Sequence, residues 1–266
     1  MDDADRPPID LRTDVPHPAR VYDYWLGGKD NFAVDREMAE RLIEAIPGAA
    51  GSARANRAFL KQAVRFVVGS GVRQFIDIGS GLPTAENTHE IAHRTDPECR
   101  VVYVDNDPIV RVHGEALLAR TGSTVVVQAD LRHPGEILTH PEVAGLIDFD
   151  RPLGLLLLGV LHFLPDDEAH AVLDRLRRAL APGSVLVVSH LTADSDPEGM
   201  GQFINVLTKT PDAAVASPRT RDQIERFFDG FDLVDPGIVA VHRWRPTQPT
   251  STTDQFWLWA GIGIAQ

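Results

Sequence analysis

The sequence is poor in cysteine and in positive charge, and both shortages limit its chemistry. Its single cysteine, Cys99, allows no disulfide within the chain and no cysteine cluster for zinc. Acidic residues outnumber Lys and Arg by 38 to 26, giving a net charge of −12. No basic run of the kind that contacts phosphate backbones is present. We therefore expect no metal site and no nucleic-acid partner, and a small-molecule partner instead.

Long hydrophobic runs are also missing. The longest apolar run, over 153–164, contains Gly and His and is shorter than the roughly 20 residues that span a bilayer. The N-terminus is acidic and rich in proline, without the basic and then apolar pattern of a signal peptide. We expect a cytoplasmic protein that does not contact membranes.

The hydrophobic periodicity divides the chain into segments. Residues 1–18 are polar and predict a loose arm, and 19–266 predict a single domain. Within that domain, helical spacing over 34–46 and 52–68 predicts an N-terminal helical cap, 19–70. Residues 71–190 form a core, and 191–266 add further helices and a terminal hairpin.

The core alternates apolar strands with helices. Strands are predicted at 74–78, 100–104, 124–128, 153–158 and 185–189, and helices at 84–94, 108–120 and 166–180. This alternation is typical of a doubly wound α/β sheet with parallel strands. Helices are then predicted at 198–208 and from Thr220 to Gly230, and strand-like runs at 237–242 and 255–264 predict an antiparallel hairpin. The expected fold is a Rossmann-like sheet of seven strands, mostly parallel.

A glycine-rich turn follows the first core strand. Asp77 ends the strand, and Gly79, Ser80 and Gly81 lead toward the next helix. Glycines at these positions let the backbone turn tightly and approach a ligand closely. We expect this loop to bind a nucleoside-containing cofactor, with Asp77 orienting an amine or a water.

Acidic residues end the next two strands. Asp105, beside Asn106, follows the second strand, where a carboxylate accepts hydrogen bonds from a ribose diol. Asp107 is expected to cap the following helix instead. Asp130 follows the third strand and is placed to accept from an adenine amino group, while Leu131 packs on the ring. Three acids at three successive strand ends favour one shared site.

These motifs resemble class I S-adenosylmethionine-dependent methyltransferases over about 74–190. The segment 156–166, which contains Gly159, is similar to the fourth-strand motif of that fold, and 180–184 is similar to its entry to strand five. Pro83 and Ser184 replace glycines of the usual motifs. The resemblance implies S-adenosylmethionine as cofactor, S-adenosylhomocysteine as product, and Gly159 as a cofactor contact.

A second resemblance covers nearly the whole chain. The segments 17–32, 55–59, 79–84 and 242–246 are similar to an actinobacterial family of S-adenosyl methyltransferases with no assigned substrate. It implies the fold and the cofactor and leaves the methyl acceptor open.

Candidate catalytic residues lie near the predicted strand ends and in the cap. His162 follows the fourth strand, where an acceptor approaches, and is either a base or a packing residue. Tyr22 belongs either to a lid, with Trp25 and Asn31, or to a structural clasp. Lys29 either meets the cofactor carboxylate or is a solvated turn residue.

Weaker candidates complete the predicted site. Arg54 or Arg57 could pair with the cofactor carboxylate, although charges on a helix surface seldom act so specifically. His190 is a further possible base, and Phe203 and Asn205 could line the acceptor pocket.

Three functions remain open from the sequence. The preferred one is methyl transfer from S-adenosylmethionine to a small molecule. A non-catalytic protein that binds S-adenosylmethionine is the second, because no proton-transfer pair is evident. The third is an NAD-dependent oxidoreductase, for which Thr84 stands where a third glycine is expected.

Overall fold

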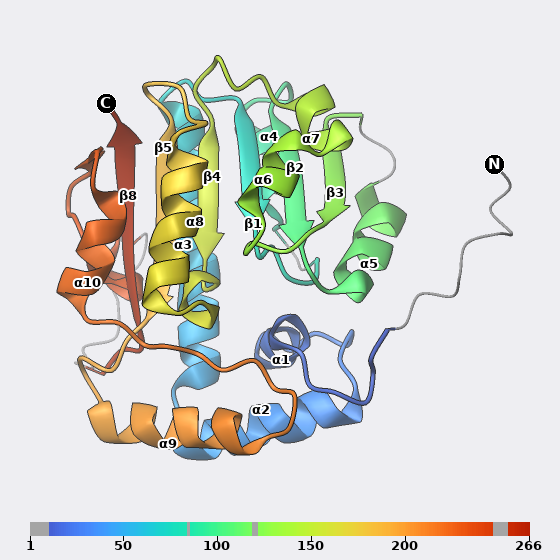
Figure 1. Cartoon of the computed structure of the whole chain (residues 1–266), viewed down its shortest axis with the longest axis vertical. Coiled ribbons are helices and arrows are strands. Elements are labelled where there is room, and N and C mark those ends of the chain that lie inside the picture. The colour runs from blue at the N-terminus through green and yellow to red at the C-terminus, as the bar shows by residue number, and fades with distance from the viewer. Residues whose placement is uncertain (1–10, 84–85, 119–121, 247–254) are drawn as a thin grey trace, which may run out of the picture.

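The computed structural model describes residues 11–83, 86–118, 122–246 and 255–266. One mixed sheet forms its centre (Figure 1). The strands are β1 (Gln74–Ile78), β2 (Arg100–Asp105), β3 (Thr124–Gln128), β4 (Gly154–Leu158), β5 (Val185–Leu191), β6 (Phe231–Leu233), β7 (Val239–Ala240) and β8 (Leu258–Ala265). Their order is β3-β2-β1-β4-β5-β8-β6, and β7 pairs with β8 beside this path. Strands β1 to β5 are parallel, whereas β8 is antiparallel to β5, β6 and β7.

This order confirms the predicted α/β methyltransferase sheet of seven strands. The parallel strands are buried on both faces, and successive side chains enter different cores. Phe75 of β1 packs in one core and Ile76 in the other. The same alternation places Leu156 and Leu157 of β4 on opposite faces. Strands buried on both sides are nearly continuous apolar runs, which explains their clarity in the sequence.

Helices cover both faces of the sheet (Figure 1). The helices are α1 (Pro18–Trp25), α2 (Ala33–Ala45), α3 (Ala49–Gly69), α4 (Thr88–Thr95), α5 (Pro108–Leu118), α6 (Pro134–Thr139), α7 (Pro141–Leu146), α8 (Asp166–Arg177), α9 (Pro197–Lys209) and α10 (Arg221–Glu225). The 3₁₀ turns in the described ranges are η2 (Leu161–Phe163), η3 (Arg226–Phe228) and η4 (Val241–Arg243). Helices α3 and α4 contribute to one core, and α7 and α8 to the other.

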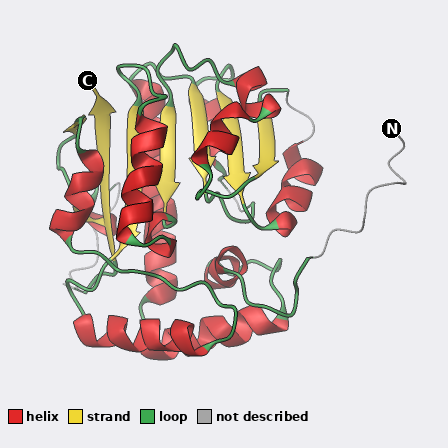
Figure 2. Ribbon diagram, viewed as in Figure 1, coloured by secondary structure: helices red, strands yellow, loops and turns green. Residues whose placement is uncertain are grey.

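Three helices lie across the carboxyl ends of the parallel strands (Figure 2). Helices α2 and α9 run side by side below the sheet, and α1 lies between them and the strand ends. The cap therefore joins an N-terminal helix pair to a helix inserted after β5. Because ligands of open α/β sheets bind at the carboxyl ends of the strands, this cap closes the region where a site is expected.

The N-terminal segment differs from the predicted loose arm. In the described part, the Arg20 guanidinium donates to the carbonyl oxygens of Arg12 and Val15 at 3.3 and 3.0 Å. The backbone N–H of His17 donates to Asp35 at 2.9 Å. Residues 12–17 are therefore fastened to α1 and α2, because buried side chains of the cap supply hydrogen-bond partners for this backbone.

Several elements were absent from the predicted set. They are α1, α6, α7 and β6. The predicted run at 237–242 contains β7 followed by η4, so the edge partner of β8 is β6. The capping box of α10 is confirmed, since the Thr220 side chain accepts from Gln223 and the Gln223 side chain accepts from Thr220. Among the described helices, none has the length and apolar character needed to cross a membrane.

Candidate functional site

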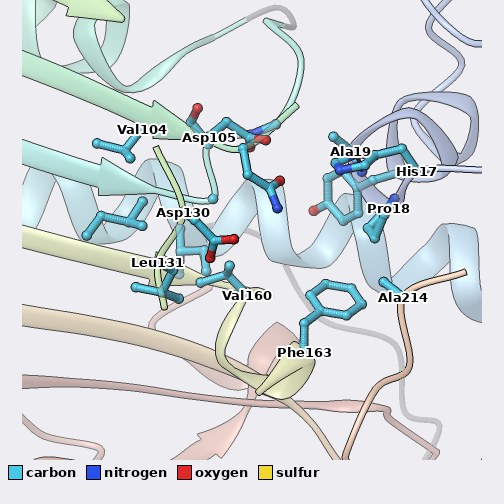
Figure 3. Close-up of a pocket in the computed structure, with 18 of the residues that line it drawn as sticks. His17, Pro18, Ala19, Val104, Asp105, Asp130, Leu131, Val160, Phe163 and Ala214 are labelled. Atoms are coloured by element: carbon cyan, nitrogen blue, oxygen red, sulfur yellow. Dashed lines mark hydrogen bonds between the residues drawn. The ribbon is translucent and has the colours of Figure 1, made fainter. Parts of the chain in front are cut away.

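A cavity of about 750 Å³ lies at the carboxyl ends of β1 to β4. Figure 3 shows Asp105, Asp130 and Leu131 on the side of the strands, with His17, Pro18 and Ala19 facing them from the cap. Phe163 and Ala214 lie on a third side (Figure 3). The volume is within the range of about 300–1,000 Å³ typical of small-molecule sites.

The predicted glycine loop forms one wall of this cavity. Gly79 has φ +73°, and a Cβ atom on it would lie 2.5 Å from Cγ2 of Val160. Its N–H donates to the carbonyl of Val104 at 2.8 Å, which ties the loop to β2. Gly81 has φ +67°, and a Cβ atom on it would have no described atom within 4 Å. Positive φ and close approach both explain why glycine occupies position 79.

Asp77 is buried behind this loop. Thr88, the first residue of α4, donates its hydroxyl to Oδ2 of Asp77 at 2.6 Å. Burial raises the pKa of Asp77 to about 6, against the opposing influence of the Thr88 hydrogen bond and the Arg57 charge. Asp77 and Arg57 both line the cavity, so they offer a carboxylate and a guanidinium to one ligand.

Asp105 lies at the end of β2 as predicted. Its Oδ2 accepts from the N–H of Gly81 at 2.8 Å, and its Oδ1 accepts from the N–H of Asp107 at 3.0 Å. Burial raises the pKa of Asp105 above its ordinary value. A carboxylate has about four acceptor positions, so two remain for a ligand diol. The neighbouring Asn106 is exposed and lines the same cavity.

Asp130 and Leu131 also line the cavity. The Asp130 carboxylate accepts from the Arg132 guanidinium, with the shortest distance 2.6 Å. These hydrogen bonds lower the pKa of Asp130, despite partial burial. The Arg132 side chain is mostly exposed, whereas Leu131 is buried. The sequence did not indicate that Asp130 already has this cationic partner.

Ser80 supplies a further polar group. Its hydroxyl oxygen is buried and has no hydrogen-bond partner among the described residues. Because an unsatisfied buried hydroxyl is unfavourable, a polar ligand group here would stabilise the loop. The Ser80 hydroxyl, the three aspartate carboxylates and Arg57 line a cavity of suitable volume. Together they fit a nucleoside that carries an amino acid.

Tyr22 and Asn56 connect the cap to the cavity. The Tyr22 hydroxyl donates to the carbonyl of Ala53 at 3.0 Å and accepts from Nδ2 of Asn56 at 3.2 Å. Burial raises the pKa of Tyr22. Since the Tyr22 proton is committed to Ala53, the amide orientation of Asn56 is fixed and its Oδ1 lacks a partner within the described structure. Both hydrogen bonds of the Tyr22 hydroxyl are made to α3, so Tyr22 orients Asn56, and the catalytic role of Tyr22 stays a prediction.

Gly159 and His162 lie close to Asn56. A Cβ atom on Gly159, which has φ +68°, would be 3.7 Å from Nδ2 of Asn56 and 3.8 Å from Cε1 of His162. His162 accepts from the N–H of Leu191 at Nδ1, at 3.4 Å, so its proton resides on Nε2. Burial lowers the pKa of His162 to about 3, and the Arg219 charge adds to the effect. This geometry does not favour His162 as a base, and its catalytic role stays a prediction.

His190 is removed from the cavity by its partners. Its Nδ1 donates to the Leu191 carbonyl at 2.8 Å, and its Nε2 accepts from Arg219 at 2.7 Å. Arg219 also donates to Asp166 and to the carbonyls of Leu161 and Leu164. The structure does not favour His190 as a base, because both ring nitrogens are engaged and the side chain is fully buried.

The other predicted residues differ in whether they line the cavity. Lys29 is exposed and is not among the residues that line the cavity, so its cofactor role is not supported by its position. Arg54 is exposed, whereas Arg57 lines the cavity. Asn31 is buried and donates to Asp23 at 2.8 Å, which makes it part of the cap structure. Asn205 is exposed.

Sequence inspection missed a buried charge cluster next to the cavity. Asp107 caps α5 by accepting from Ile109 at 2.9 Å, as predicted, and its second oxygen lies 3.1 Å from Nδ1 of His17 and 3.3 Å from Nε of Arg20. Arg20 and Asp107 are each 2% exposed. This cluster fastens the cap to the loop after Asp105. Pro18, which follows the capping residue His17, was the sequence signal for α1. It did not indicate that Arg20 pairs with Asp107.

Metal binding has no support in the described structure. Its His, Cys, Asp and Glu side chains nowhere form a group of three or more that could hold an ion.

The chain was compared with known proteins. Residues 4–266 match the family model described as S-adenosyl methyltransferase. A candidate methyltransferase from Thermobifida fusca is 42% identical, with 98% of both chains covered and a TM-score of 0.91. A DUF574 family protein from Streptomyces avermitilis is 37% identical, with a TM-score of 0.92 over 96% of this chain and 100% of that one.

A curated relative is more distant. Carboxy-S-adenosyl-L-methionine synthase from Geobacter metallireducens is 32% identical over 110 residues, which is 41% of this chain and 41% of that protein. This chain thus matches less than half the length of that relative. The match of the family model over nearly all residues is decisive, and the chain belongs to the S-adenosyl methyltransferase family.

Proposed function

We propose that this protein transfers a methyl group from S-adenosylmethionine to a small-molecule acceptor. The observation that carries the proposal is the cavity at the ends of β1 to β4, which gathers Asp77, Asp105 and Asp130 around the Gly79–Gly81 loop. Membership in the S-adenosyl methyltransferase family supports the same cofactor.

Each polar group has a part of S-adenosylmethionine that it would hold. Asp105 would accept from the ribose hydroxyls, and Asp130 with Leu131 would contact the adenine. Arg57 and Asp77 would bind the carboxylate and the ammonium of the methionine part, because each charge meets its opposite. When bound, the cofactor supplies an activated methyl group on a sulfonium.

The protein's part in the reaction is then chiefly alignment and exclusion of water. Helices α1 and α3 line the cavity from the cap side, for example through Tyr22 and Asn56. Tyr22 and Asn56 hold each other in a fixed orientation at the cap wall, and His162 is placed as a neutral donor rather than as a base. We infer a reaction in which the acceptor needs no strong base from the protein.

A protein that binds S-adenosylmethionine without turnover is the second candidate, favoured by the hydrogen bonds that engage Tyr22 and His190. Synthesis of carboxy-S-adenosyl-L-methionine, the activity in the name of one relative, is less compatible with the site. A carboxylate on the transferable group would need a cation near His162 and Asn56, and none of the described residues that line the cavity beside His162 is Lys or Arg.

The proposal is tested with S-adenosylmethionine that carries a deuterated methyl group. The protein is incubated with this cofactor and a panel of uncharged small molecules, and products are detected by mass spectrometry. We expect a labelled methyl product together with S-adenosylhomocysteine. Tight cofactor binding without labelled product across the panel would favour the binding protein.

A further inference from the structure

A smaller cavity of about 120 Å³ adjoins the one described above. Both cavities are lined by Tyr22, Asn56, Gly159 and Phe163, so these residues mark their common boundary. Beyond them the smaller cavity extends under the cap, between α1, α2, α3 and α9. Its aromatic walls are Trp25, Phe163, Phe203 and Trp257.

The smaller cavity is mostly apolar. None of its described lining residues is Lys, Arg, Asp or Glu, and the aliphatic ones include Met38, Leu42 and Leu207. His17 also lines it, and Nδ1 of that ring faces Asp107 at 3.1 Å. His162 lines it in the neutral form that its hydrogen bond to Leu191 requires. Moving an ion from water into such a space without a partner is strongly unfavourable. An occupant of this cavity therefore carries no charge on the part that enters it.

Its size corresponds to one ring. An apolar cavity of about 150 Å³ lined by Leu, Ile and Phe side chains accepts benzene and excludes water. The smaller cavity is close to that volume and is lined in the same way, with aromatic side chains that prefer edge-to-face or offset contact with a ring.

The boundary between the cavities carries one polar atom without a partner. Oδ1 of Asn56 is an acceptor that finds no partner in the described part of the chain, and the same holds for the donor Nε1 of Trp257, which lines the smaller cavity alone. Asn56 is 5% exposed, so its unsatisfied oxygen is unfavourable unless a bound molecule donates to it. A hydroxyl or N–H on the ring would satisfy Asn56 at the point where the two cavities meet.

We propose that the smaller cavity binds an uncharged aromatic ring of the methyl acceptor, with its hydroxyl or N–H directed to Asn56 at the boundary. This inference rests on the proposed function, since it identifies the second substrate of the same site. Gly159 keeps the boundary open, because a side chain there would stand between Asn56 and His162.

The transfer balances without a protein base. A lone pair of the ring-borne oxygen or nitrogen forms the bond to the methyl carbon, and the bond from that carbon to sulfur breaks with its electrons remaining on sulfur. The proton of the acceptor leaves to solvent through the larger cavity, because the smaller one offers no carboxylate among its described lining residues. The products are the methylated ring and S-adenosylhomocysteine.

The test measures binding of phenol and benzoate, which differ in charge at neutral pH, by ligand-observed NMR with and without saturating S-adenosylhomocysteine. Ala49 and Ala213 line the smaller cavity alone, so Ala49→Leu and Ala213→Leu each fill it from a different element. Ala58→Leu places the same change on an exposed position of α3 and serves as control. Thermal unfolding confirms that each variant folds.

We expect phenol to bind at least about tenfold more tightly than benzoate, because the carboxylate loses hydration without a partner. Each filling variant should weaken phenol binding by about tenfold or more and change affinity for S-adenosylhomocysteine less than about twofold, and Ala58→Leu should change neither. Equal binding of phenol and benzoate, or undiminished phenol binding in both filling variants, would overturn the inference. Failure of the proposed function gives a different result from failure of this inference. In that case S-adenosylhomocysteine would not bind, while phenol binding to the smaller cavity would still be measured in its absence.

Discussion

The carboxylate of Asp105 accepts a hydrogen bond from the backbone N–H of Gly81 at 2.8 Å. This contact joins the end of β2 to the glycine loop after β1, so one side chain both shapes the loop and faces the cavity. Asp105 therefore links the geometry of the loop to ligand binding. Substitutions of Asp105 can distinguish these two roles.

Replacement of Asp105 should therefore weaken cofactor binding. Asp105→Ala removes a buried charged acceptor, and we expect loss of about 1.5–3 kcal/mol in affinity for S-adenosylhomocysteine, the range for hydrogen bonds to charged groups. Asp105→Asn, which keeps an oxygen for the Gly81 N–H, should retain the fold and lose part of the affinity. Calorimetry on both folded variants measures the effect, and unchanged affinity in Asp105→Ala would refute the ribose assignment.

Cofactor affinity should depend on pH through Asp77. Burial raises its pKa to about 6, so the carboxylate is ionised above that pH and protonated below it. If Asp77 holds the cofactor ammonium, affinity for S-adenosylhomocysteine should fall as pH decreases below 6, approaching about tenfold per pH unit. Asp77→Asn should bind more weakly at neutral pH and lose this dependence. Parallel pH profiles for the two proteins would contradict the role of Asp77.

Gly79 should tolerate substitution poorly, for a reason that can be tested with Val160. Gly79→Ala places a Cβ 2.5 Å from Val160 at φ +73°, and we expect a loss of about 2–4 kcal/mol of unfolding free energy from overpacking and backbone strain. Val160→Ala in the same chain should recover about 1 kcal/mol or more relative to additive effects. Gly81→Ala, whose Cβ meets open space, is the matched control for strain alone. Denaturant unfolding of the wild type, Gly79→Ala, Val160→Ala and the double variant gives the coupling energy, and additivity would show that Val160 does not cause the cost.

Arg219 should be a main support of the turn that carries His162. Its guanidinium donates to His190 and to the carbonyls of Leu161 and Leu164, and it is 2% exposed. Arg219→Met should lower the unfolding free energy by about 2–5 kcal/mol, because several buried acceptors lose their donor. Arg221→Met, on an exposed neighbouring residue, should cost much less. Equal stabilities of the two variants would show that the buried network contributes little.

Much of the core followed from periodicity, and β1 and β3 begin and end at their predicted residues. Strands buried on both faces are distinct in sequence because almost every side chain is apolar. Helices α6 and α7 are six residues each and begin at Pro134 and Pro141, so proline at the first helical position was their one local signal. Strand β6 is three residues long and depends on pairing with β8, which no local pattern encodes.

The cofactor side of the site was more predictable than the acceptor side. Asp77, Asp105 and Asp130 lie at strand ends whose alignment the parallel sheet dictates. The pairing of Arg20 with Asp107 and the amide orientation of Asn56 instead depend on contacts between residues far apart in the chain. The cofactor role of Lys29 stays a prediction without support from its position, since Lys29 is exposed and does not line the cavity.

The most direct test of the central claim is calorimetric titration of the purified protein with S-adenosylmethionine, S-adenosylhomocysteine and NAD under identical conditions. We predict binding of the first two at about micromolar dissociation constants, equivalent to about 8 kcal/mol, with no heat of binding for NAD. Binding of NAD without binding of either sulfur compound would contradict the account and make the Gly79–Gly81 loop a dinucleotide site.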